Sequence, residues 1–194
     1  MKKLLFSLLL VSTLAHAQEE EILQRKALFL AEIADRFEVI GLNATEPDYG
    51  ALSPDEASIH EFIKLKQLEK EVNTLGNNIR PKYDLSLFSY ESEAELKEAL
   101  KYWFKDFMEL ERITPGRDIR TVPNAEPTII IADTQHIAIL TLSCYSIDTQ
   151  EFRDWRETML ELFGSPFSIV IEIGCEGPLE WTKNAPDPKD KSWR

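Results

Sequence analysis

The chain has 194 residues, of which 22 are Lys or Arg and 34 are Asp or Glu, so its formal charge is −12. Hydrophobic residues make up 43% and charged residues 29%, a balance that is typical of a folded domain and excludes a disordered or collagen-like chain. Nucleic-acid binding relies on Lys and Arg side chains that neutralise phosphates. Because acids predominate here, we expect no nucleic-acid partner.

Residues 1–17 have the three parts of a cleavable export signal. Met1-Lys2-Lys3 is basic, Leu4–Leu14 is mostly apolar, and Ala15-His16-Ala17 has the small residues that signal peptidase requires. The apolar stretch rises only about 16 Å as a helix, which is too short for the ~30 Å hydrocarbon core of a bilayer. We therefore expect cleavage after Ala17, no membrane span, and export to the periplasm of a Gram-negative bacterium.

Residues 18–80 are predicted to form a helical hairpin. Apolar residues recur every three or four positions from 18 to 41 and again from 53 to 76, and a glycine ends each run. Ser53-Pro54-Asp55-Glu56 is a typical helix start, with Ser as the N-cap and Pro in the first turn. Two antiparallel helices are expected from this pattern.

Residues 81–175 are predicted to form an α+β sheet domain. Strands are expected at Tyr83–Leu87, Thr128–Ala132, His136–Tyr145 and Phe167–Cys175, with one helix beginning at Ser92 and another running from Asp148 or Thr149 to Gly164. The order β-α-β-β-α-β is that of the split βαβ, or ferredoxin-like, arrangement, an antiparallel sheet with both helices on one face. Residues 176–194 are expected to be a mobile C-terminal tail. Its Trp181 is the one residue that we consider able to dock on the folded domain.

Cys144 and Cys175 are the only cysteines, and in an exported protein they are expected to form a disulfide. The nearest histidine, His136, would lie about 26 Å from Cys144 along one strand, so a catalytic thiol is not expected. In the ferredoxin-like order the two cysteine strands are about 9–10 Å apart, more than the ~7 Å between Cα atoms that a disulfide allows. Either the cysteines meet beyond the end of the sheet, or the strand order differs.

No residue pattern points to a catalytic or metal site. His60-Glu61 begins like a zinc-protease motif, but Lys64 stands where the second histidine is needed. Glu172 interrupts an apolar strand and is expected to face solvent or a cleft, as an ordinary carboxylate rather than a general acid. His136 is expected on the surface. We therefore predict no catalytic residue, no metal and no cofactor, and we favour a protein that is not an enzyme over one that is.

The helix that begins at Ser92 carries an acidic stripe opposite its apolar seam, formed by Glu95, Glu98 and Glu109 with Tyr102 among them. A solvated helix face is the ordinary interpretation. Combined with the net charge, however, the stripe favours a partner protein with a basic surface, because opposite charges steer association.

The sequence therefore predicts a periplasmic protein-binding module of the inhibitor or immunity-protein type, which neutralises a partner protein. Two alternatives stay open. One is a periplasmic carrier of a small apolar ligand, because the aromatic and leucine side chains of the helices could line a pocket. The other is a carboxylate-dependent hydrolase without a familiar motif.

Overall fold

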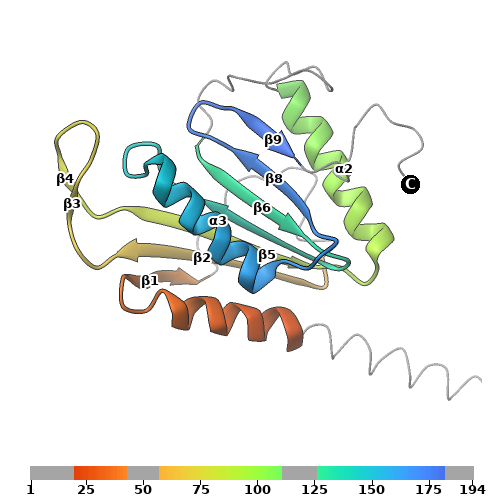
Figure 1. Ribbon diagram of the computed structural model, residues 1–194. Helices are drawn as coiled ribbons and strands as arrows, with labels where there is room; N and C mark the ends of the chain where they lie inside the picture. Colours follow the sequence, from red (N-terminus) through yellow and green to blue (C-terminus); the bar gives the residue numbers. More distant parts are fainter. Residues whose placement is uncertain (1–19, 43–56, 111–125, 182–194) are drawn as a thin grey trace, which may run out of the picture.

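The protein is built around one antiparallel sheet. The computed structural model describes residues 20–42, 57–110 and 126–181 (Figure 1). Its sheet has seven strands in the order β1-β2-β5-β7-β6-β8-β9, and a separate two-stranded hairpin, β3–β4, lies beside it. The strand bounds are Phe37–Leu42 (β1), Ile59–Gln67 (β2), Glu71–Val72 (β3), Asn78–Ile79 (β4), Lys82–Ser89 (β5), Thr128–Ala132 (β6), His136–Thr141 (β7), Ile169–Ile173 (β8) and Leu179–Trp181 (β9).

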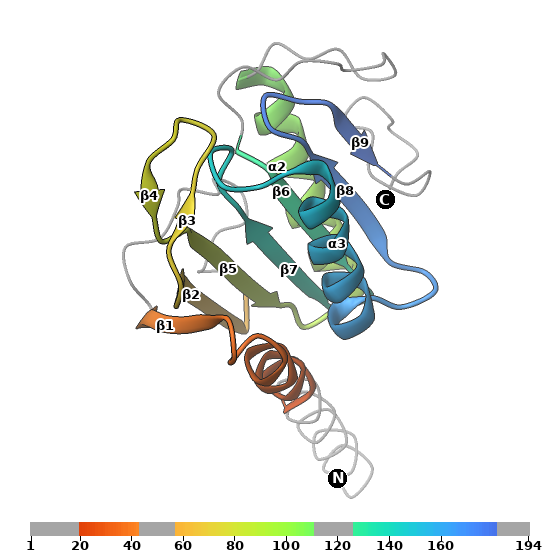
Figure 2. The same ribbon diagram turned by 60° about the vertical axis from the view of Figure 1, so that its left-hand side comes forward.

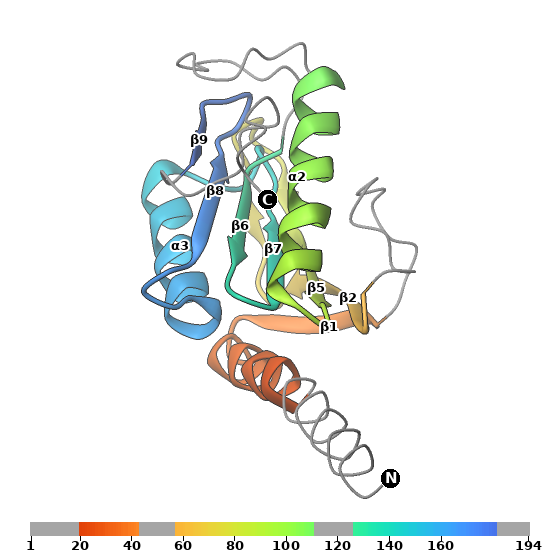
Figure 3. The same cartoon turned by 90° about the vertical axis from the view of Figure 1, so that its right-hand side faces the viewer.

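Helices cover both faces of this sheet (Figures 2 and 3). On one face, α2 (Glu93–Leu110) packs through an apolar seam that includes Leu100. On the other face, α3 (Thr149–Phe163) and the helical segment 20–32 pack around Trp155. The buried side chains accordingly form two apolar clusters, separated by the sheet.

The central strands are apolar because both of their faces are covered. All five residues of β6 are buried, and β7 is buried in all but its last residue, Thr141. A continuous β-branched run bounded by turn residues is the pattern expected of such a strand. The sequence contains it at residues 128–132, which is why this strand could be predicted.

Side-chain caps begin both long helices. The hydroxyl of Ser92 accepts a hydrogen bond from the N–H of Glu95 at 3.3 Å. At α3 the carboxylate of Asp148 accepts from the two backbone N–H groups of Gln150 and Glu151. These bonds satisfy donors that have no partner within the helix. The predicted starts of both helices are confirmed.

From β5 to β8 the elements follow the predicted succession of strand, helix, strand, strand, helix, strand. The mixed α+β class and the antiparallel sheet are confirmed. The ferredoxin-like strand order, however, is not the order found. In that order the last strand would pair with the first, whereas β8 pairs with β6, and β5 lies between β2 and β7.

The position of β8 explains why the helices lie on opposite faces rather than on the single face that was predicted. The connections β5–α2–β6 and β7–α3–β8 step across the sheet in the same direction, each past one strand. β5 and β7 run antiparallel, so two crossovers of the same hand place their helices on opposite sides. In the ferredoxin-like order the second crossover steps back, which returns its helix to the first face.

The predicted N-terminal helical hairpin is largely replaced by strands. Residues 20–32 are helical as expected, but a strand begins at Phe37, and the described part of the second predicted helix contains β2. In β2 the side chains of Ile63 and Leu65 enter the cluster beneath α3, with a lysine between them. The same segment also has apolar residues at three- and four-residue spacing, which is the pattern of a helix. Pairing with β1 and β5 favours the strand over the helix.

Gly76, which was expected to end the second helix, instead lies in the turn between β3 and β4. Its φ angle is +80°, a conformation that glycine adopts without the steric cost of a side chain. The helix start at residues 53–56 lies outside the described residues, as does the predicted signal peptide.

The segment after β8 is more ordered than the predicted tail. β9 pairs with β8 at the edge of the sheet, and Trp181 packs against the cluster beneath α2. Residues 182–194 lie outside the described part of the chain. Among the residues that the structure does describe, no helix is both long and apolar enough to cross a membrane.

Candidate functional site

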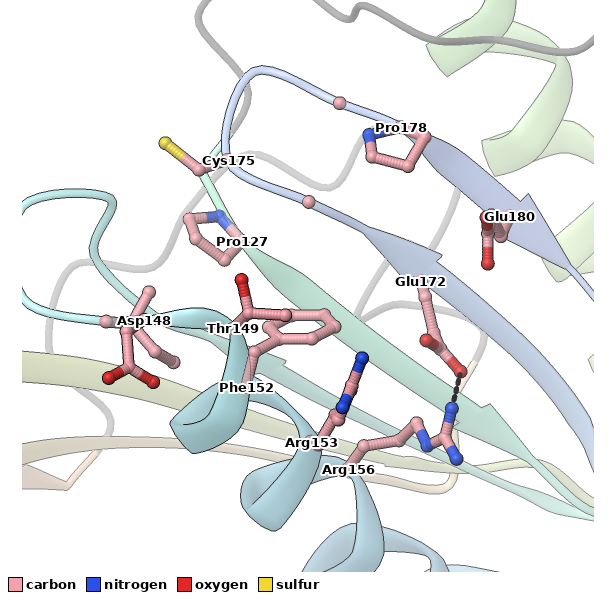
Figure 4. Close-up of a pocket in the computed structure, with 13 residues that line it drawn as sticks. Pro127, Asp148, Thr149, Phe152, Arg153, Arg156, Glu172, Cys175, Pro178 and Glu180 are labelled. Atoms are coloured by element: carbon pink, nitrogen blue, oxygen red, sulfur yellow. Dashed lines mark ion pairs between the residues drawn. The ribbon is translucent and has the colours of Figure 1, made fainter.

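A cleft of about 520 Å³ opens between the first half of α3 and the β8–β9 edge of the sheet (Figure 4). Small-molecule sites commonly have volumes of roughly 300–1,000 Å³. Three segments that are distant in the sequence line it: the residue before β6, the start of α3, and the β8–β9 hairpin. The lining residues are Pro127, Ile147, Asp148, Thr149, Phe152, Arg153, Arg156, Glu172, Gly174, Cys175, Gly177, Pro178 and Glu180.

Two arginines occupy the helical wall of the cleft. Arg153 and Arg156 are three residues apart, so they project from the same side of α3. The cap at Asp148 fixes where the helix begins and therefore which residues face the strands. Figure 4 shows both arginines beside Phe152, whose ring adds an apolar surface to this wall.

Two glutamates occupy the opposite wall. Glu172 of β8 and Glu180 of β9 are direct partners across the strand pair, so their side chains lie on the same face. A guanidinium nitrogen, Nη1 of Arg156, lies 3.5 Å from Oε1 of Glu172. Burial raises the pKa of Glu172; Arg156 counteracts this shift and the Glu180 carboxylate adds to it. The expectation that Glu172 faces solvent or a cleft agrees with this position.

The disulfide between Cys144 and Cys175 is present, with the two Cα atoms 5.2 Å apart. β7 and β8 flank β6 and both run antiparallel to it, so both end where β6 begins. Because β6 separates them, the cysteines meet in the turns beyond the end of the sheet. The first explanation left open by the sequence is therefore the one that accounts for the disulfide. The strand order does differ from the ferredoxin-like order, but it still leaves one strand between the two cysteine strands. Since Cys175 also lines the cleft, the disulfide fixes part of the cleft wall to the turn after β7.

The predicted partner-binding residues lie elsewhere. Glu95, Glu98 and Tyr102 are exposed on α2, across the sheet from the cleft. Their spacing places them on one side of the helix. Glu109 belongs to the same helix, but its side chain lies outside the described part of the structure. The stripe is thus a surface distinct from the cleft.

His136 was expected on the surface, but it is buried at the start of β7 beside Asp133. Burial by itself would raise the pKa of Asp133. Hydrogen bonds from the His136 ring and from the backbone N–H groups of Gln135 and His136 outweigh that effect and lower the pKa to about 2. The short β6–β7 turn places the N–H groups of Gln135 and His136 where both donate to Oδ1 of Asp133. Both side chains are largely buried at the β6–β7 turn, and neither lines the cleft.

His60 and Glu61 do not form the zinc-protease motif, because that motif lies on a helix and both residues lie in strand β2. The imidazole of His60 stacks on the ring of Phe88 with 4.7 Å between centroids, and Glu61 forms an ion pair with Lys26. Within the described ranges, no group of three or more His, Cys, Asp or Glu side chains is placed to hold a metal ion.

Sequence reasoning missed the arginines. Arg153 and Arg156 stand on the polar side of an amphipathic helix, where arginine is unremarkable. Only their position opposite Glu172 distinguishes them, and that depends on where β8 lies in the sheet. Glu172 itself was the available signal, as an acid within an otherwise apolar strand.

Comparisons of the chain with protein-family models, curated proteins and solved structures give no match.

Proposed function

We propose that the protein is an exported, periplasmic protein-binding module that neutralises a partner protein, in the manner of an inhibitor or immunity protein. The observation that carries this proposal is the exposed face of α2, where Glu95, Glu98 and Tyr102 lie together. Interfaces favour aromatic side chains near their centre, and complementary charge raises the association rate. The partner's contacting surface is basic.

Two further features support the proposal. The net charge of −12 attracts a basic partner before the two surfaces are in contact, which raises the rate of encounter. The disulfide suits a protein that works in an oxidising compartment such as the periplasm. Cleavage after Ala17 would leave this charge more negative, because the removed segment contains two lysines and no acid.

Affinity capture from a periplasmic extract tests the proposal. The mature protein should recover a basic protein, whereas a variant with Glu95→Lys and Glu98→Lys should not. The matched control reverses Glu157 and Glu161, which are exposed on α3 across the sheet, and should recover the partner as the unaltered protein does. Equal loss with both variants would contradict a specific role for α2.

A second candidate function is the binding of a small molecule, which the cleft beside α3 favours. The cleft has the volume of a ligand site, and it joins apolar and charged side chains. Native mass spectrometry of the protein isolated from its host should then show a bound species of low mass. The Arg153→Gln variant should carry less of it, and Arg80→Gln, an exposed arginine outside the cleft lining, should carry the same amount.

A further inference from the structure

We infer that the cleft beside α3 binds a small zwitterion with a free carboxylate and a free ammonium group, such as an amino acid or a short peptide. This inference rests on the second candidate function and gives it a ligand class. Its basis is the separation of charge across the cleft: the arginines lie on the helical wall and the glutamates on the strand wall (Figure 4).

The helical wall offers a carboxylate site. Arg153 has no carboxylate within 4.0 Å among the side chains that the structure describes, and the Arg156–Glu172 contact is long for a hydrogen-bonded ion pair. A guanidinium presents a planar fork of donors that matches the two oxygens of a carboxylate. A ligand carboxylate therefore accepts hydrogen bonds from the guanidinium of Arg153 and lies near that of Arg156.

The strand wall offers an ammonium site. Glu172 and Glu180 are direct cross-strand neighbours of like charge, and like charges in this position repel. A cation between the two carboxylates relieves the repulsion and forms charge-assisted hydrogen bonds with both. Asp148 also lines the cleft, but its carboxylate already accepts two backbone hydrogen bonds at the start of α3.

The remaining lining selects against other ligand classes. A purely apolar ligand would remove Arg153 and Glu180 from water without offering either of them a charged partner, at a cost in free energy. A simple anion would meet the two glutamates, in a protein that is already strongly acidic. Phe152, Pro127 and Pro178 supply an apolar surface for the side chain of the zwitterion.

The test compares three peptides by isothermal titration calorimetry on the disulfide-bonded protein: glycyl-phenylalanine, its N-acetyl form and its C-terminal amide. The free dipeptide should bind most tightly, and each capped form should bind about tenfold more weakly or worse, since each loses a charge-assisted contact. Arg153→Gln should abolish the difference between dipeptide and amide. Glu180→Gln should abolish the difference between dipeptide and N-acetyl form.

Arg80→Gln and Glu157→Gln, which change exposed residues that do not line the cleft, serve as matched controls and should leave both differences intact. Laurate is titrated as a fourth probe. Capped peptides that bind as well as the free dipeptide would overturn the inference. Laurate binding without dipeptide binding would overturn it while leaving the second candidate function in place. Binding of none of the four probes would contradict both.

Discussion

Arg25 and Asp133 are separated by 108 residues in the chain, yet Nη1 of Arg25 donates a 2.9 Å hydrogen bond to Oδ2 of Asp133. The same nitrogen donates to the carbonyl oxygen of Phe163 at 3.0 Å. One side chain thus fastens the helical segment 20–32 to the β6–β7 turn and to the end of α3. Because the side chain of Asp133 is only 7% exposed, this hydrogen bond is largely shielded from solvent.

Replacing Arg25 by Gln should destabilise the protein by about 2 kcal/mol. Removing one partner of a fully buried pair costs more than this, but Asp133 keeps its backbone hydrogen bonds and Arg25 is partly exposed. Urea unfolding measures the change. The matched control is Lys66→Gln, which breaks an exposed pair with Glu38 and should have no measurable effect. Equal losses in both variants would contradict the role assigned to Arg25.

Asp133 should make the protein sensitive to acid. Its pKa is about 2 in the folded protein, below the ordinary value of 3.8, so the folded state favours the charged carboxylate. This contribution to stability is fully present above about pH 4 and is lost as the pH falls through 2, for a total of about 2 kcal/mol. Unfolding free energies measured from pH 5 to pH 2 should fall more steeply for the unaltered protein than for Asp133→Asn. Parallel curves would show that Asp133 contributes nothing.

Trp155 should be among the most costly core residues to truncate. Its ring contacts those of Phe29, Phe37 and Tyr83, with centroids 6.1, 5.4 and 5.7 Å away, and it joins α3 to the N-terminal segment. Trp155→Ala should cost about 3–5 kcal/mol of unfolding free energy. Phe167→Ala, at a position that is 82% exposed, should cost almost nothing by the same measurement. A loss below about 1 kcal/mol at Trp155 would mean that the cluster is loosely packed.

The disulfide closes a loop with a sequence separation of 31 residues. By restricting the unfolded chain it should contribute about 3–4 kcal/mol. The variant with Cys144→Ser and Cys175→Ser should therefore melt about 10 °C lower in calorimetry. Thiol titration of the denatured, unreduced protein should find no free thiol. Two free thiols, or an unchanged melting temperature, would contradict this contribution.

Local signals were sufficient for part of the fold. The caps at Ser92 and Asp148 and the apolar run 128–132 determine their elements through short-range chemistry, and the structure confirms all three. The strand at Ile59–Gln67 could not be recognised in this way, since its apolar spacing also suits a helix and its pairing partners lie elsewhere in the chain.

Neither the strand order nor the cleft could be predicted from local sequence signals, and the reason is the same for both. The position of β8 beside β6 depends on contacts between strands that the succession of elements leaves undetermined. The cleft joins Pro127, Arg153 and Glu180 only after that order is established. Glu172 indicated a polar site on its strand, but nothing near it in the sequence indicated the arginines opposite.

The association rate with the captured partner, measured by stopped flow over a range of salt concentration, tests the central claim most directly. Electrostatic steering predicts that the rate for the unaltered protein falls by about tenfold or more between roughly 20 and 300 mM salt. Reversing Glu95, Glu98 and Glu109 to Lys should slow association at low salt and flatten this dependence, with an unchanged circular dichroism spectrum. A rate that is indifferent both to salt and to these substitutions would contradict partner binding through the acidic face of α2.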